Sequence, residues 1–319
     1  MNRAEEPGSR GAEAKGPLSS APAPLRSSAQ SAGLTLRLRT TLEMIKFSHT
    51  LFALPFALLA AFLAARGLPS WPTLAKILMA MVGARSAAMA HNRLADHEID
   101  AVNPRTVTRA LPSGALTRGF VRVFLVASVA LFLIAAATLN RLTLLLSPVA
   151  LGLLFFYSYT KRFTWLSHLV LGLCLALAPI GAWIAVTGSI GWTPILLGMA
   201  VFWWTAGFDI LYALQDEEHD RKAGLQSLPA RWGTRTALVA SALLHAAMIP
   251  LLVAVWCLSG GGLLFAASIA ATAAALLYQH AIVKPGDLSR INAAFFTANG
   301  FVSVVLAACG IADVLLRST

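Results

Sequence analysis

The sequence predicts an all-helical integral membrane protein, on three observations. Hydrophobic residues make up 57% of the 319 residues and charged residues only 12%, whereas about 25% of an ordinary soluble domain is charged. Apolar runs long enough to span a bilayer, about 20 residues, recur from residue 44 almost to the C-terminus. Most charged residues fall between these runs. Helices follow because lipid offers no partner for unpaired backbone groups.

Residues 1–33 differ from the rest of the chain in composition. They are rich in Ala, Ser, Pro and Gly, carry charges of both signs and hold no apolar core of a secretory signal. This composition predicts a disordered cytoplasmic tail. Residues 34–319 are then the membrane domain, in which nine transmembrane helices are predicted at about 44–65, 72–94, 119–138, 142–159, 165–187, 193–213, 236–257, 261–283 and 292–315.

The distribution of the basic residues predicts the orientation of these helices. The net charge of +11 does not indicate a nucleic-acid partner, because the Lys and Arg residues sit mainly in alternate connections between apolar runs. The opposite set of connections holds only Arg66, Arg141 and Arg317. Positively charged connections stay in the cytoplasm. We therefore expect a cytoplasmic N-terminus, an outer C-terminus, and cytoplasmic positions for the two longest connections, about 95–118 and 214–235.

The acidic residues are sparse, and most of them form two clusters. No acid lies between Glu43 and Asp96 or between Asp100 and Asp209. Asp96 and Asp100 are four residues apart, and the same spacing returns at 216 and 220 in the second cluster. Similar turns follow, Ala-Leu-Pro at 110–112 and Ser-Leu-Pro at 227–229. We read two related four-helix halves plus a ninth helix, with a central cavity open to the cytoplasmic side.

These clusters have the chemistry of a divalent-metal site. Residues four apart share one face of a helix, and two carboxylate pairs brought together repel unless cations lie between them. Oxygen ligands suit Mg²⁺, which keeps some waters and bridges a few carboxylates to substrate phosphates. An acidic but merely solvated loop is the alternative, and we favour it for the glutamates 98, 217 and 218. The predicted metal ligands are Asn92, Asp96, Asp100, Asp216 and Asp220.

Basic residues accompany both clusters. Cations stabilise the charge that develops on the leaving oxygen of a diphosphate. The predicted diphosphate-binding residues are Arg105, Arg109, Lys161, Arg162, Arg221 and Lys222.

Two further charges lie inside predicted helices. Arg85 stands seven residues before Asn92, and Asp209 stands seven before Asp216, so each continues a polar stripe into the membrane. A charge at that depth costs about 2.5–3.5 kcal/mol on insertion scales. We expect both side chains to face a polar cavity.

At these residues the chain resembles the UbiA superfamily of intramembrane prenyltransferases. That family carries Asn-Asp-x-x-Asp-x-x-x-Asp after its second helix and Asp-x-x-x-Asp after its sixth, which match 92–100 and 216–220 here. Arg93 stands where the family often has Asp, which removes one possible ligand. Segments 103–106, 109–114 and 157–162 also resemble the family, and the resemblance covers about residues 40–315.

The resemblance implies an enzyme that transfers a polyprenyl group from its diphosphate to an aromatic acceptor. The motif residues would bind the diphosphate through Mg²⁺, and Lys161, with Arg109 and Lys222, would neutralise the departing diphosphate. Tyr157 would shield or position the allylic cation through its ring face. A bacterial inner membrane is the expected location.

The acceptor pocket is predicted from charged residues near the first two helices. Lys46, His49 and Arg85 are the candidates, since a buried cation can pair with an acceptor carboxylate. Asp209 would take the ring proton or orient the acceptor. We expect a 4-hydroxybenzoate-type acceptor of quinone synthesis. Stretches 46–55 and 209–216 also resemble the futalosine branch of menaquinone synthesis, whose acceptor is a dihydroxynaphthoate. A membrane transporter is the alternative of another class.

Overall fold

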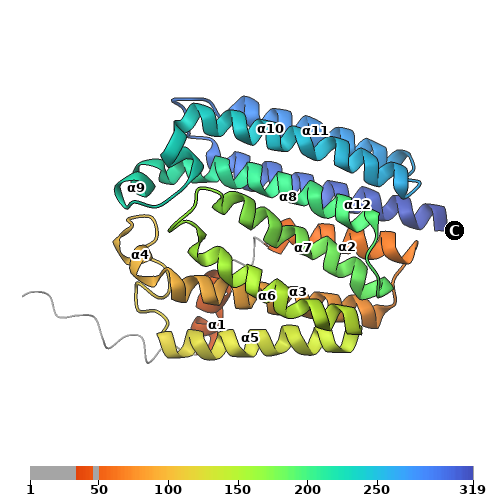
Figure 1. The fold of residues 1–319 in the computed structure, drawn as a ribbon, viewed down its shortest axis with the longest axis horizontal. Helices are drawn as coiled ribbons and strands as arrows, with labels where there is room; N and C mark the ends of the chain where they lie inside the picture. The colour runs from red at the N-terminus through yellow and green to blue at the C-terminus, as the bar shows by residue number, and fades with distance from the viewer. Residues whose placement is uncertain (1–33, 46–49, 319) are drawn as a thin grey trace, which may run out of the picture.

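The computed structural model describes residues 34–45 and 50–318, and every long element among them is a helix. The long helices run side by side along the long axis of the molecule (Figure 1). In chain order they are α1 (Leu34–Met44), α2 (Thr50–Ala65), α3 (Trp71–Ala95), α4 (His97–Val102), α5 (Arg118–Leu139), α6 (Arg141–Thr160), α7 (Ser167–Thr187), α8 (Trp192–Ala213), the 3-10 turn η2 (Leu214–Asp216), α9 (Glu217–Lys222), α10 (Leu228–Leu258), α11 (Leu263–Ile282), the π-helical turn η3 (Ala293–Ala298) and α12 (Asn299–Ser318).

Eight helices in the described residues are long and apolar enough to cross a membrane. The remaining predicted span, at about 44–65, corresponds to α2, which is shorter. The main difference from prediction is α10, which begins at residue 228 rather than at about 236. Ser227 caps its first turn through the backbone N–H of Ala230, and Pro229 occupies that turn, where its missing N–H costs nothing. Gly233, with φ of 77°, then bends the chain into the long apolar part.

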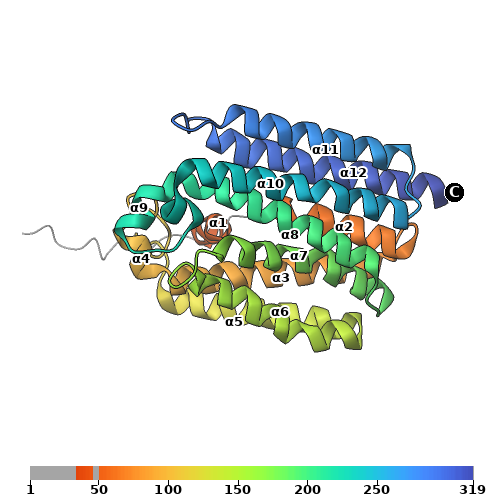
Figure 2. The ribbon, with the colours of Figure 1, turned by 45° about the horizontal axis from the view of Figure 1, so that its top comes forward.

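The helices pack as neighbours along the chain and across it. In Figure 2, α8 lies between α7 and α10, and α2 runs close to α7 and α12. The α7–α8 contact is close because Gly172 faces the backbone oxygen of Phe202, where a Cβ would come within 2.5 Å. The main core between these helices holds Trp204 and Phe56, whose side chains are fully buried. This core fixes α8, which carries Asp209 and leads into the second acidic cluster.

The far end of the bundle is closed by a polar latch. Asp313 of α12 accepts hydrogen bonds from the backbone N–H groups of Gly262 and Phe265, at 2.8 and 3.4 Å. It therefore caps α11, whose own N-cap residue has no side chain. Arg317 pairs with Asp313 at 2.8 Å and donates to the carbonyl oxygen of Gly260 at the end of α10. The latch ties α10, α11 and α12 together.

The two acidic clusters lie at the same end of the bundle. The short helices α4 and α9 occupy that end, and the C-terminus lies at the opposite end (Figure 1). Asp96 joins α3 to α4 with φ of −95° and ψ of 6°, and Asp216 joins η2 to α9 with φ of −105° and ψ of 4°. The same backbone conformation at both junctions supports two related halves.

Candidate active site

Both junctions aim their carboxylates into one cavity. The cavity has a volume of about 540 Å³ and is lined by Asp96 and Asp100 from the first motif and by Asp216 and Asp220 from the second. All except Asp96 are buried in the protein. The predicted convergence of the two motifs on one space is therefore present in the structure.

Each of these four carboxylates has a basic partner of its own. All four bases come from connections outside the acidic motifs: Arg105 and Arg109 from the loop after α4, and Lys161 and Arg162 from the turn after α6. The closest nitrogen–oxygen distances are 3.3 Å for Asp96–Arg162, 2.7 Å for Asp100–Arg109, 2.6 Å for Asp216–Arg105 and 3.3 Å for Asp220–Lys161.

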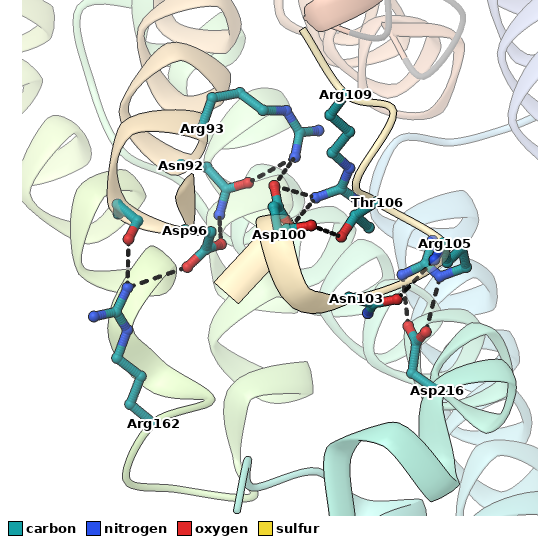
Figure 3. Close-up of polar contacts among 11 residues, drawn as sticks. Asn92, Arg93, Asp96, Asp100, Asn103, Arg105, Thr106, Arg109, Arg162 and Asp216 are labelled. Atoms are coloured by element: carbon teal, nitrogen blue, oxygen red, sulfur yellow. Dashed lines mark hydrogen bonds and ion pairs between the residues drawn. The ribbon is translucent and has the colours of Figure 1, made fainter. Parts of the chain in front are cut away.

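The loop after α4 places Arg105 at the second motif (Figure 3). Asn103 Oδ1 accepts a hydrogen bond from the backbone N–H of Arg105 at 2.9 Å, which shapes the turn. Thr106 Oγ1 donates to the carbonyl oxygen of Asp100 at 3.0 Å and holds the loop against α4. Burial alone would lower the pKa of Arg105, but the hydrogen bond and charge of Asp216 raise it above its ordinary value. Arg105 is thus fixed as a cation.

The first motif is held together by Asn92 and Arg93. Asn92 Nδ2 donates to Asp96 Oδ2 at 2.7 Å, and Nη1 of Arg93 lies 3.6 Å from Asp100 Oδ2 (Figure 3). Arg93 is 4% exposed and lines the cavity, so it brings a buried cation into the motif. Burial raises the pKa of the Asp96 carboxyl above its ordinary value with help from the charge of Asp100, although the bonds from Arg162 and Asn92 oppose it.

The side chains around the cavity fit the predicted Mg²⁺ only if substrate and water supply further ligands. Among the described residues, no group of three or more His, Cys, Asp or Glu side chains is close enough to hold a metal ion by itself. Mg²⁺ does not require such a cage, since it is commonly held by one or two carboxylates together with substrate phosphates and water. Four carboxylates and the Asn92 amide around one cavity are oxygen donors of that kind.

Away from the acids, the cavity becomes apolar. It continues between α3, α5, α6 and α7 toward the other end of the bundle, past Met81, Phe132, Leu146, Ala150, Leu175 and Leu139. Leu139 is the last residue of α5, so the lining reaches the end opposite the motifs. One cavity thus joins a charged end to a long apolar channel.

The remaining predicted residues divide into those that line the cavity, those outside the described residues, and those that lie away from the cavity. Arg85, Tyr157 and Asp209 line the cavity, as do the four bases that pair with the motif acids. Lys46 and His49 lie outside the described residues.

Arg221 and Lys222 are not brought to the cavity. They pair instead with Glu217 and Glu218 on the surface of α9, at 2.8 and 2.7 Å, and their side chains are 59% and 74% exposed. Helical spacing of four residues favours these local pairs.

One buried residue of the site was not predicted. His168, at the start of α7, lies 2.7 Å from Asp209 through Nδ1 and is almost completely buried. A lone histidine at the edge of an apolar run gives little sign of such a partner, because the pairing depends on how α7 packs against α8.

The fold and the cavity define a class of protein: a multi-pass membrane protein with an internal cavity that is lined by acids and bases at one end and by apolar side chains along the rest.

Comparison with known proteins gives the family. The model of the UbiA prenyltransferase family matches residues 53–303, and the chain belongs to this family. The 4-hydroxybenzoate octaprenyltransferase of Vibrio campbellii is 32% identical over 250 residues, which cover 77% of this chain and 86% of that protein. The enzyme of the same name from Citrobacter koseri is 31% identical over 247 residues, with coverages of 77% and 85%.

Solved structures show the same fold. The apo structure of a UbiA homolog from Aeropyrum pernix K1 matches with a TM-score of 0.76 and 36% identity, covering 84% of this chain and 98% of that one. A UbiA homolog from Archaeoglobus fulgidus, bound to GPP and Mg²⁺, matches with a TM-score of 0.69 and 23% identity, covering 86% and 99%. The predicted all-helical membrane fold and the predicted family are confirmed.

Proposed function

We propose that this protein transfers a polyprenyl group from polyprenyl diphosphate to the ring of an aromatic carboxylate of the 4-hydroxybenzoate type, in quinone synthesis. The observation that carries the proposal is the single cavity, which joins four paired aspartates at one end to an apolar channel through the bundle. Membership of the prenyltransferase family and the names of its relatives favour this chemistry over transport.

The diphosphate binds at the charged end. Arg105, Arg109, Lys161 and Arg162 surround that end and donate hydrogen bonds to oxygen, which suits a diphosphate as well as a carboxylate. Mg²⁺ held there would neutralise the charge that develops on the leaving oxygen. The ligands proposed for it are Asn92, Asp96, Asp100, Asp216 and Asp220.

The prenyl chain lies in the apolar channel. Loss of the diphosphate leaves an allylic cation, which water would quench, so the channel must be dry. Tyr157, Phe52 and Phe295 line the cavity, and their ring faces attract a cation. The apolar channel and these rings thus protect the allylic cation until the acceptor attacks it.

The acceptor carboxylate pairs with Arg85. This guanidinium lines the cavity on α3, two turns before Asn92, so it lies deeper in the bundle than the motif. A carboxylate pairs well with the planar fork of an arginine. Lys46 and His49 stay predictions for the same pocket.

The charged end of the cavity lies on the cytoplasmic side of a bacterial inner membrane. This orientation follows from the concentration of Lys and Arg in the connections on that side. It gives water-soluble acceptors and Mg²⁺ direct access to the site.

A competition assay tests the function. Purified protein in lipid is given one polyprenyl diphosphate with equal amounts of 4-hydroxybenzoate and a dihydroxynaphthoate, with and without Mg²⁺, and the products are weighed by mass spectrometry. We expect prenylated benzoate only when Mg²⁺ is present. Prenylated naphthoate as the main product would reassign the acceptor to menaquinone synthesis, and no covalent product with either acceptor would refute the proposal.

A further inference from the structure

Asp209 and His168 form a hydrogen-bonded pair on the cavity wall, deeper than the motif aspartates. Asp209 lies on α8, two turns before Asp216, and its side chain is 17% exposed where it borders the cavity. His168 lies behind it with its imidazole 2% exposed, and its Nδ1 is 2.7 Å from Asp209 Oδ2. The carboxylate therefore faces the cavity and the imidazole supports it from the protein side.

The second ring nitrogen of His168 fixes which atom carries the proton. Nε2 lies 3.3 Å from the backbone nitrogen of Leu228, which can only donate. A ring nitrogen that accepts has no proton, so a neutral imidazole in this setting holds its proton on Nδ1 and donates it to Asp209. Leu228 is the first residue of α10, so α7, α8 and α10 together orient the carboxylate.

Asp209 differs from the four motif carboxylates in its partners. Each motif carboxylate faces an arginine or lysine within 3.3 Å. Asp209 has the imidazole on Oδ2, and within the described part of the chain its other oxygen, Oδ1, has no hydrogen bond. One oxygen lone pair at the cavity is thus left to accept a proton.

We propose that Asp209 is the catalytic base that removes the ring proton of the acceptor and that His168 is a positioning residue for it. The assignment rests on the function proposed above. The C1–O bond to the diphosphate breaks first and leaves the allylic cation, and the ring carbon then forms a bond to C1 of that cation. The same ring carbon then loses its proton to Oδ1 of Asp209, and the C–H bonding pair restores the aromatic ring. Products are prenylated acceptor, diphosphate and one proton.

The position of the pair suits this step. Arg85 on α3 and Asp209 on α8 line the same cavity, and both lie about two turns deeper than their motifs. An acceptor whose carboxylate is bound by Arg85 lies beyond the diphosphate, with a ring edge open to another wall of the cavity. Among the described residues, Asp209 is the acidic residue on that wall that forms no ion pair with a lysine or arginine.

Ring-deuterated acceptor tests the base. Asp209→Asn keeps an oxygen to accept the bond from His168, so the variant should fold and bind polyprenyl diphosphate as the wild type does. We expect its kcat to fall by about 10²–10⁴-fold with little change in either KM. Proton removal then limits the rate, so an isotope effect absent from the wild type should appear with acceptor deuterated at the alkylated carbon. Wild-type kcat, or a slow variant without an isotope effect, would overturn the assignment.

Two substitutions of His168 test its role. His168→Gln can keep both bonds, because the amide nitrogen donates to Asp209 while the amide oxygen accepts from Leu228, and we expect near-wild-type kcat. His168→Ala loses both, and kcat should fall by about 10–100-fold, as for other supporting partners. A folded His168→Gln enzyme as slow as His168→Ala would overturn the positioning role. If the wild-type protein itself makes no prenylated product, the proposed function fails instead, so the two failures are distinguishable.

Discussion

Arg105 and Asp216 join the two acidic connections through two parallel hydrogen bonds. Nε of Arg105 lies 2.8 Å from Oδ1 of Asp216, and Nη2 lies 2.6 Å from Oδ2. The arginine comes from the connection after the first motif and the aspartate belongs to the second motif, so this pair links the two halves of the protein at the charged end of the cavity (Figure 3). The guanidinium also lies 5.7 Å from the ring centre of Tyr212.

Loss of this link should weaken catalysis. Arg105→Gln removes a cation that holds Asp216 and that we propose to bind the diphosphate, so kcat/KM for polyprenyl diphosphate should fall by about 10²–10³-fold. The kcat/KM of Arg105→Lys should lie between those of the wild type and Arg105→Gln, because an ammonium group cannot bind both carboxylate oxygens in the same plane. Steady-state kinetics on purified variants measures both. Equal activity in Arg105→Gln and wild type would show that this pair has no part in the reaction.

The motif aspartates should be essential. Asp96→Ala and Asp216→Ala each remove a proposed metal ligand, and we expect no measurable turnover from protein that still inserts and folds. Glu218→Ala is the matched control, because Glu218 lies on α9 beside the second motif but its side chain is 82% exposed and pairs with Lys222. It should keep wild-type activity. Turnover in both aspartate variants at the wild-type rate would refute the metal assignment.

Arg85 should act on the acceptor. Arg85→Met removes the cation but keeps much of the side-chain volume, and the KM for the aromatic acid should rise by at least about tenfold while the KM for polyprenyl diphosphate stays the same. Product assays with each substrate varied in turn separate the two constants. A rise confined to the diphosphate KM would move Arg85 to the other substrate.

Removal of Mg²⁺ should stop the reaction reversibly. Because all the proposed protein ligands are oxygen atoms, we expect chelation by EDTA to abolish turnover and added Mg²⁺ to restore it. Ca²⁺ should restore less, since it prefers more ligands at longer distances. Isothermal titration of Mg²⁺ in the presence of a non-reactive diphosphate analogue gives a second readout, and heat of binding that is unchanged in Asp96→Ala would contradict the proposed ligands.

The latch at the far end should affect stability without affecting catalysis. Asp313→Ala leaves two backbone N–H groups of α11 without their acceptor, which costs about 1–3 kcal/mol per buried unsatisfied group. The midpoint of thermal unfolding in detergent should fall, while kcat of the folded enzyme is unchanged. Asp313→Asn keeps one acceptor oxygen and should lose less stability. An unchanged midpoint in Asp313→Ala would show that the latch is not stabilising.

The spans and the convergence of the motifs were predictable because both depend on local patterns. Apolar runs of bilayer length specify helices almost regardless of context. Asp96 and Asp216 end their helices at the same side because an even number of spans lies between them. The start of α10 differs from prediction because Ser227 and Pro229 begin a helical turn at residue 228, and Gly233, whose backbone is not helical, separates this turn from the apolar part near the predicted start.

The partners of the acids were not predictable in the same way. Arg105 reaches across to Asp216 rather than to the nearer Asp100, and that choice depends on the turn at Asn103. Arg221 and Lys222 were placed at the diphosphate from their proximity in sequence, but helical spacing gives them nearer acids on α9. His168 had no sequence signal because its partner lies on another helix.

The four ion pairs also have a consequence for selectivity between ligands. A free phosphate that bound one of these bases in place of its aspartate would leave the negative charge of that aspartate without a partner. A divalent ion that bound an aspartate alone would likewise leave the positive charge of its base without a partner. A ligand that carries both signs together, a diphosphate with its cations, satisfies both members of each pair at once. We therefore expect the ligand-free protein to bind neither phosphate alone nor a divalent ion alone at concentrations at which the diphosphate and its cations bind tightly together.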